Sequence, residues 1–95
     1  MSDTFTVFCI YDSKSESWSR PVFSRNEATC QREIRDVLAQ GQTPYSAHPE
    51  DYTLFKVGLW SESDHEIKYL VAPESLGVLV QYVRKPVEYD LGSAA

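Results

Sequence analysis

Hydrophobic and polar residues alternate along most of this chain with the periods of short strands and of one helix. Over residues 4–11 both alternating positions become apolar after the first residues, which indicates a central strand. The polar residues 12–17 predict a turn, and residues 18–23 predict a second strand that pairs with the first. Pro21 cannot donate a hydrogen bond to a strand ladder, so we expect this second strand at a sheet edge or at a bulge.

A helix is predicted to follow. Ser24 and Glu27 have the S-x-x-E spacing of a capping box, which predicts Ser24 as the N-cap. Apolar side chains then recur at helical spacing and form a core stripe: Cys30, Ile34, Val37 and Leu38. Gly41 predicts the end of the helix, because glycine readily adopts the left-handed conformation of a C-terminal cap.

The second half of the chain predicts another hairpin. Residues 42–51 are interpreted as a loop, 52–60 as a third strand, 61–65 as a turn and 66–71 as a fourth strand. Beyond Pro73, apolar residues recur at i, i+3, i+4 and i+7: Leu76, Leu79, Val80 and Val83. This spacing favours a short second helix, although the β-branched residues leave a fifth strand as the alternative.

These elements predict an α+β fold in the order β-β-α-β-β-α. Two hairpins joined by a helix form an antiparallel sheet of about four strands with the helices packed on the sheet. Residues 1–84 are expected to form a single domain, and residues 85–95 a flexible C-terminal tail. A sheet of this kind leaves edges and apolar surface exposed, so we expect a homodimer that buries sheet-face or edge residues. The alternative is a monomer whose C-terminal segment completes the core.

Composition narrows the class of protein. Hydrophobic residues make up 42% of the 95 residues, enough for a core, and no apolar run approaches the roughly 20 residues of a membrane span. The N-terminus lacks the order of a secretory signal, so we expect a cytosolic protein without membrane contact, with Cys9 and Cys30 as reduced thiols. The net charge of −5 disfavours generic binding to phosphate backbones, but it permits a local basic stripe or docking on a basic partner.

The segment His-Pro-Glu-Asp at residues 48–51 is the strongest candidate for catalytic or metal chemistry. Its His48, Glu50 and Asp51 are residue types that act as acids, bases or metal ligands. No nucleophile motif, glycine-rich phosphate loop or metal-ligand spacing accompanies them, and the other histidine, His65, lies in a charged turn. We interpret the segment as the polar approach to a strand, with its carboxylates capping a turn. A non-enzymatic protein without metal or cofactor is therefore predicted.

Cations interspersed with aromatic residues suggest a different kind of site. Single-stranded nucleic acid is held by cations that follow the backbone and by aromatic rings that stack on bases. The candidate contacts are Lys14, Trp18, Arg20, Arg25, Arg32, Arg35, Arg84 and Lys85. Arg25 and Arg32 are seven residues apart and are predicted to share one exposed helix stripe with Arg35 beside it. Because Glu33 and Asp36 interleave with these cations, an ordinary solvated surface is the alternative.

Two stretches of the chain resemble a known family. They are "TVFCIYDSKSESW", followed by "PVF", and "HPEDYTLFKVGLW", followed by an acidic turn. Over residues 4–83 the chain is similar to the small nonstructural protein of the gokushovirus-like microviruses, isometric phages with circular single-stranded DNA genomes. Residues 11–14, residues 49–55 and Gly58 carry most of the similarity. The helix resembles the family's small-x-Arg-x-aromatic pattern, with Ile34 departing from the aromatic position.

The resemblance implies a viral nonstructural protein that binds DNA and acts in genome replication or packaging. We therefore expect weak to moderate binding of single-stranded DNA in the host cytoplasm. The alternative is an adaptor that docks on the phage replication initiator or the procapsid and switches DNA synthesis to packaging without strong DNA binding. The acidic charge motivates this alternative, because an acidic surface suits a basic partner.

Overall fold

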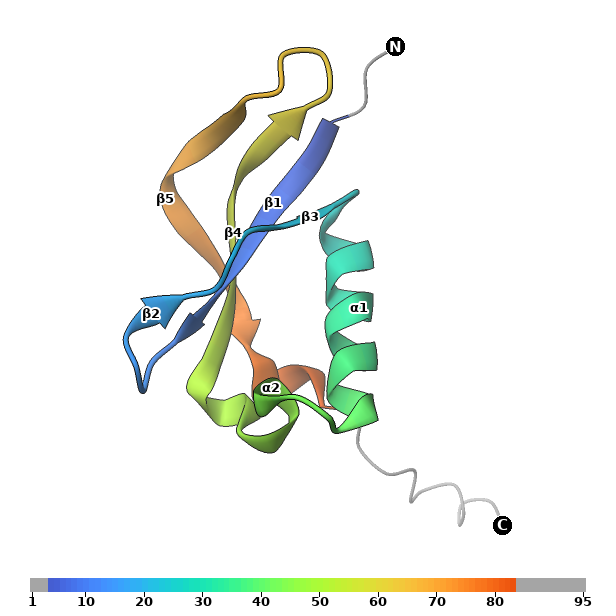
Figure 1. The fold of residues 1–95 in the computed structure, drawn as a ribbon, viewed down its shortest axis with the longest axis vertical. Coiled ribbons are helices and arrows are strands. Elements are labelled where there is room, and N and C mark those ends of the chain that lie inside the picture. The colour runs from blue at the N-terminus through green and yellow to red at the C-terminus, as the bar shows by residue number, and fades with distance from the viewer. Residues whose placement is uncertain (1–3, 84–95) are drawn as a thin grey trace, which may run out of the picture.

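The computed structural model describes residues 4–83, so the predictions for residues 85–95 and for Arg84 and Lys85 lie outside it. The fold is α+β, as predicted. Its antiparallel sheet has five strands in the order β2-β1-β4-β5, and β3 also pairs with β1. The strands are β1 (Thr4–Asp12), β2 (Ser17–Trp18), β3 (Val22–Ser24), β4 (Tyr52–Ser61) and β5 (Ile67–Val78). Helix α1 (Glu27–Gln40) lies along one side of this sheet, as Figure 1 shows.

The predicted second strand is divided into β2 and β3. Trp18 pairs with Tyr11, and Val22 pairs with Phe8, while the residues between Trp18 and Val22 leave the strand. Ser19, within this gap, is still hydrogen-bonded to Ile10 of β1. The Ser19 backbone N–H donates to the Ile10 carbonyl, and the Ser19 Oγ accepts from the Ile10 N–H, both at 2.8 Å. Because β4 pairs with the whole of β1 on the other side, β2 and β3 share an outer edge. The expectation that Pro21 marks a sheet edge is confirmed.

The start of α1 differs from the prediction. Ser24 belongs to β3, where it pairs with Thr6, and the N-cap is Asn26. The Asn26 side chain accepts a hydrogen bond from the Thr29 N–H at 2.8 Å. Ser24 as N-cap is therefore wrong, because sheet pairing holds it in β3, two residues before the actual N-cap. The prediction for the other end is confirmed, since Gly41 caps α1 with φ 70°.

The predicted loop at residues 42–51 contains two short helices, and in this respect the loop prediction is wrong. They are α2 (Pro44–Ala47) and the 3-10 helix η1 (Pro49–Asp51). Thr43 caps α2 by accepting from the Ser46 N–H, and the Ser46 Oγ donates to the Val37 carbonyl at 3.1 Å. This hydrogen bond ties the segment to α1.

Strand β5 is longer than predicted and includes the first part of the segment beyond Pro73, so the predicted second helix is reduced to a short 3-10 helix. The strand continues to Val78, and only then does a 3-10 helix, η2 (Leu79–Tyr82), follow. Pro73 is tolerated inside β5 because this is an edge strand whose pairing with β4 is interrupted nearby. Leu79 and Tyr82, three residues apart, are both buried. Of the predicted apolar stripe, Leu79 is buried but Val80 and Val83 are exposed, because a 3-10 turn directs Leu79 and Tyr82 into the core instead.

The core lies between α1 and one face of the sheet. Its buried members come from β1, α1, β4 and η2: Phe8, Ile10, Cys30, Leu38, Leu54, Leu79 and Tyr82. Val7 is also fully buried but stands outside this cluster. Because neighbouring residues of a strand point to opposite faces, Val7 belongs to the other face of the sheet. We call that second face, directed away from α1, the open face.

Candidate nucleic-acid interface

Aromatic residues from all five strands gather on the open face. Residues paired directly across neighbouring strands share a face of a sheet. Tyr11 pairs with Trp18, Val7 with Phe23, Cys9 with Phe55, and Phe5 with Trp60. Tyr69 of β5 joins them through Gly58, which pairs with both Val7 and Tyr69. The aromatic residues of the open face are therefore Phe5, Tyr11, Trp18, Phe23, Phe55, Trp60 and Tyr69.

Six of these side chains form two ring clusters, one toward each end of β1. In the first, the Trp18 ring centroid lies 5.0 Å from those of both Tyr11 and Phe55. In the second, the Trp60 centroid lies 5.8 Å from that of Phe5 and 5.7 Å from that of Phe23. Inclined contacts of this kind hold aromatic side chains in defined orientations. Both clusters thus present ordered rings on the sheet surface.

Three of the aromatic residues retain much of their surface in contact with solvent. Trp18 is 48% exposed, Phe23 44% and Tyr69 69%. One of these comes from each cluster, and Tyr69 lies on the neighbouring edge strand. Apolar rings exposed on a rigid sheet are available for stacking or for contact with a partner.

Among the predicted cations in the described part of the chain, Arg25 is the one placed over an open-face ring. Its guanidinium carbon lies 5.4 Å from the Phe5 ring centroid, a cation–π arrangement. Because Arg25 precedes the N-cap Asn26, it is not part of the helix. The predicted stripe shared by Arg25 and Arg32 is therefore wrong.

The other predicted contacts are distributed around the molecule. Lys14 lies in the exposed β1–β2 turn, and its N–H donates to the Asp12 carboxylate at 2.9 Å. Arg20 lines a cavity between α1 and the sheet, and Arg32 is exposed on α1. Arg35 lies over the Tyr82 ring, at 5.2 Å from its centroid. Of the predicted set, the structure brings Trp18 and Arg25 to the open face. Strand alternation in the sequence was the signal that could have identified the other aromatic members.

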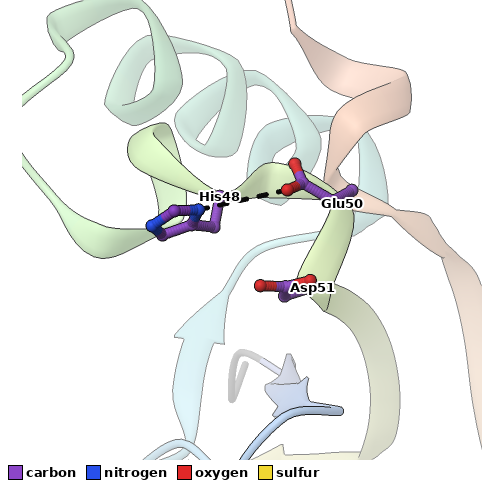
Figure 2. Close-up of side chains that lie close together, drawn as sticks. All are labelled: His48, Glu50 and Asp51. Atoms are coloured by element: carbon purple, nitrogen blue, oxygen red, sulfur yellow. Dashed lines mark ion pairs between the residues drawn. The ribbon is translucent and has the colours of Figure 1, made fainter.

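The His48, Glu50 and Asp51 side chains come from the single turn that leads into β4 (Figure 2). His48 Nδ1 lies 4.0 Å from Glu50 Oε2, and potential ligand atoms of the three residues fall within 4.8 Å of one another. Within residues 4–83, no side-chain hydrogen bond caps this turn, so the predicted carboxylate cap is wrong. Instead, the backbone carbonyl of Asp51 accepts hydrogen bonds from the N–H and Oγ of Ser13, at 2.9 and 3.0 Å. The segment therefore ties the β1–β2 turn to the start of β4.

Neither cysteine is in a disulfide within the described residues; Cys30 is buried, and Cys9 is partly buried. Burial raises the pKa of Cys9, and burial together with the nearby Glu33 carboxylate raises the pKa of Cys30 to about 11. Thiols react as thiolates, so both side chains are poor nucleophiles near neutral pH.

Comparison with known proteins places this fold in a family. No curated protein and no solved structure matches the chain. Within residues 4–83, none of the helices has the length and apolar character needed to cross a membrane. A family model described as "Phage ORF5 protein" matches residues 5–82, a span that runs from β1 to η2. The chain therefore belongs to the Phage ORF5 protein family.

Proposed function

We propose that this phage protein binds single-stranded DNA on its open face. It acts as a non-enzymatic, nonstructural protein in genome replication or packaging in the host cytoplasm. The observation that supports the proposal is the exposure of ordered aromatic rings, Trp18 and Phe23, in two clusters on one sheet face. Stacking of a base on an aromatic side chain is worth about 1–3 kcal/mol and needs no particular sequence.

The positions of the clusters suggest how a strand of DNA would lie. Phe5 and Tyr11 belong to different clusters and are separated by six residues along β1. At roughly 3.3 Å per residue, the clusters lie about 20 Å apart. A single nucleotide cannot contact both, so the proposal requires a longer oligonucleotide for full affinity.

Stacking also accommodates the acidic charge of the chain. Arg25 lies over an open-face ring, and Lys14 lies in the exposed turn that joins β1 to β2, next to the Trp18 cluster. Each phosphate neutralised on a single strand contributes about −0.7 to the slope of log affinity against log salt. Two contacts predict a slope of about −1.4, far shallower than that of a protein bound mainly through phosphates.

Fluorescence anisotropy with a labelled oligothymidine at about 50 mM salt tests the proposal. Trp18→Ala and Phe23→Ala should each weaken binding at least fivefold, since one base stack is worth about 1 kcal/mol or more. Arg25→Ala should also weaken binding, whereas its matched control Arg32→Ala, at an exposed position of α1, should not. Circular dichroism confirms that each variant is folded. No binding by the native protein, or equal losses in Arg25→Ala and Arg32→Ala, would sink the proposal.

A second candidate function is that of an adaptor for a basic phage protein. Acidic side chains gather at the exposed β4–β5 turn: Glu62, Asp64 and Glu66. This surface would suit a replication initiator or a procapsid component that handles DNA. A pull-down from infected cells, performed with and without nuclease, separates the two functions. Capture of such a protein after nuclease treatment supports the adaptor, and capture that depends on DNA supports the DNA-binding function.

A further inference from the structure

An apolar, half-open cavity lies between α1 and the sheet, beside the edge formed by β2 and β3, and Trp18 is among its lining residues. Its volume is about 610 Å³, and its floor consists of buried core residues, among them Phe8, Ile10 and Leu54. Arg20 and Glu33 line it together with these residues and are exposed. A cavity of this size and character can accommodate a group of apolar side chains.

The opposite edge of the sheet carries an apolar protrusion. Lys56 pairs with Glu74 and Gly58 pairs with Tyr69, so residues 70–73 of β5 stand opposite Val57 alone. Figure 1 shows β5 bowing away from β4 along this part of the hairpin. Val71, in the bulge, is 108% exposed, more than any other large hydrophobic residue in the described chain. We call residues 70–73 the β5 bulge.

The bulge prevents β5 from adding a regular strand of another chain. Bulges and prolines disrupt the row of unpaired backbone groups on which edge-to-edge pairing depends. The β2–β3 edge is also interrupted, by the gap that contains Pro21. An association between these edges would therefore rely on side-chain packing rather than on a continuous strand ladder.

The two irregular edges correspond in position and in charge. Positions along β1 serve to compare the two edges. Across the sheet, the β5 bulge lies opposite the step from Val7 to Phe8, and the β2–β3 gap lies opposite the neighbouring stretch from Phe8 to Tyr11. Glu74 follows the bulge, and Arg20 lines the cavity. Within residues 4–83, neither of these two charged side chains forms an ion pair.

We propose that the β5 bulge of one copy of this chain inserts into the α1–sheet cavity of a second copy. Val71 is the central apolar contact, and Glu74 of one copy pairs with Arg20 of the other. Because the bulge and the cavity are different surfaces of one chain, a single contact between two copies is head-to-tail. Such a pair leaves one bulge and one cavity free, so a chain of copies can grow. The proposal does not depend on DNA binding.

Light scattering coupled to size exclusion, without DNA and across micromolar concentrations, tests this association. The native protein should show a mass that rises with concentration above the 10.8 kDa of one chain. Val71→Asp should return it to one chain by placing a charge in the apolar contact, and Ile34→Trp should do the same by filling the cavity. Val80→Asp is the matched control, because Val80 is exposed but lies outside both surfaces, and it should behave like the native protein.

Mixing the two variants tests whether the bulge contacts the cavity. Val71→Asp keeps an intact cavity and Ile34→Trp keeps an intact bulge, so an equal mixture should form a pair that neither forms alone. The charge-exchanged double variant Arg20→Glu with Glu74→Arg should associate more tightly than either single variant. It therefore gives a test that does not require Ile34→Trp to fold.

Several outcomes overturn the proposal. A native protein that keeps the mass of one chain excludes the association, and an unaffected mass in Val71→Asp excludes the β5 bulge as the contact. Mixed variants that stay separate, together with no recovery in the charge-exchanged variant, exclude the head-to-tail geometry. A small apolar molecule retained by single chains in native mass spectrometry would assign the cavity to a ligand instead. DNA binding measured separately on Phe23→Ala remains informative in each case, because Phe23 does not line the cavity.

Discussion

Replacing Gly58 by alanine adds one methyl group where two strands come closest. Gly58 is buried in β4 and pairs with Val7 on one side and with Tyr69 on the other. A Cβ atom at this position would lie 2.8 Å from the Lys68 carbonyl oxygen and 3.2 Å from the Tyr69 Cα. Both are backbone atoms of β5, so no side-chain rotation can relieve the contact. Either β5 must move or its pairing with β4 must open.

Either displacement of β5 lowers the free energy of unfolding. Overpacking a well-filled site costs typically about 1–3 kcal/mol, and the backbone contact at Gly58 places the substitution in the middle of this range, at about 2 kcal/mol. For a domain of 60–100 residues, 1 kcal/mol lowers Tm by about 4–8 °C. Gly58→Ala should therefore lower Tm by roughly 8–16 °C.

Urea unfolding followed by tryptophan fluorescence measures the effect, since Trp60 lies two residues from the substitution. The midpoint should fall while the dependence on urea stays constant, because the surface exposed on unfolding is unchanged. Gly41→Ala is the comparison: nothing lies within 4 Å of its added Cβ, and its φ of +70° alone should cost about 1 kcal/mol. A Gly58→Ala variant within 0.5 kcal/mol of the native protein would refute the reasoning about the close contact.

Three further predictions concern the helix cap, a thiol and a buried hydroxyl. Asn26→Ala should lower the free energy of unfolding by about 1 kcal/mol, whereas Ser24→Ala should leave it unchanged or raise it, because the buried Ser24 Oγ has no hydrogen-bond partner among the described residues. Urea unfolding of both variants measures the two effects. A larger loss of stability in Ser24→Ala than in Asn26→Ala would restore Ser24 as the N-cap. Because burial raises the pKa of Cys30 from its ordinary 9.0 to about 11, alkylation of this thiol at pH 8 should be about 100-fold slower in the folded protein than in urea. Mass spectrometry of the labelled peptide measures the two alkylation rates, and equal rates would contradict the burial of Cys30. Tyr82→Phe removes the hydroxyl that donates to the Leu76 carbonyl and should lower the free energy of unfolding by about 1–2 kcal/mol. Thermal unfolding measures this loss, and a variant as stable as the native protein would contradict it.

The sequence alone was sufficient to predict the elements whose stabilising contacts are periodic. The apolar positions of β1 and β4 and the helical stripe of α1 identified these elements, because each period places one set of side chains on one face. Gly41 and Pro21 were interpreted correctly for the same local reason: their backbone restrictions hold in any fold. The antiparallel α+β arrangement followed from element order and short connections.

Pairing between segments distant in the sequence decided where α1 begins and where β5 ends. Ser24 and Asn26 are both good capping residues, and only the pairing of β3 with β1 assigns Ser24 to the sheet and the cap to Asn26. The spacing of Leu76, Leu79, Val80 and Val83 favoured a helix over a strand. The length of the β4–β5 ladder keeps the chain in β5 as far as Val78 and leaves only a 3-10 turn beyond it.

The candidate site depended on tertiary structure most of all. Alternation showed that β1 is apolar on both faces, but it could not say which face α1 would cover. Packing of Cys30 and Leu38 against Phe8 left Trp18 and Phe23 on the open face. A strand's period defines two sets of side chains, whereas burial of one set requires a partner from elsewhere in the chain. That is why the sequence proposed Trp18 and a set of cations as the DNA contacts, while packing of α1 against the sheet was needed to show which set of aromatic side chains stays exposed.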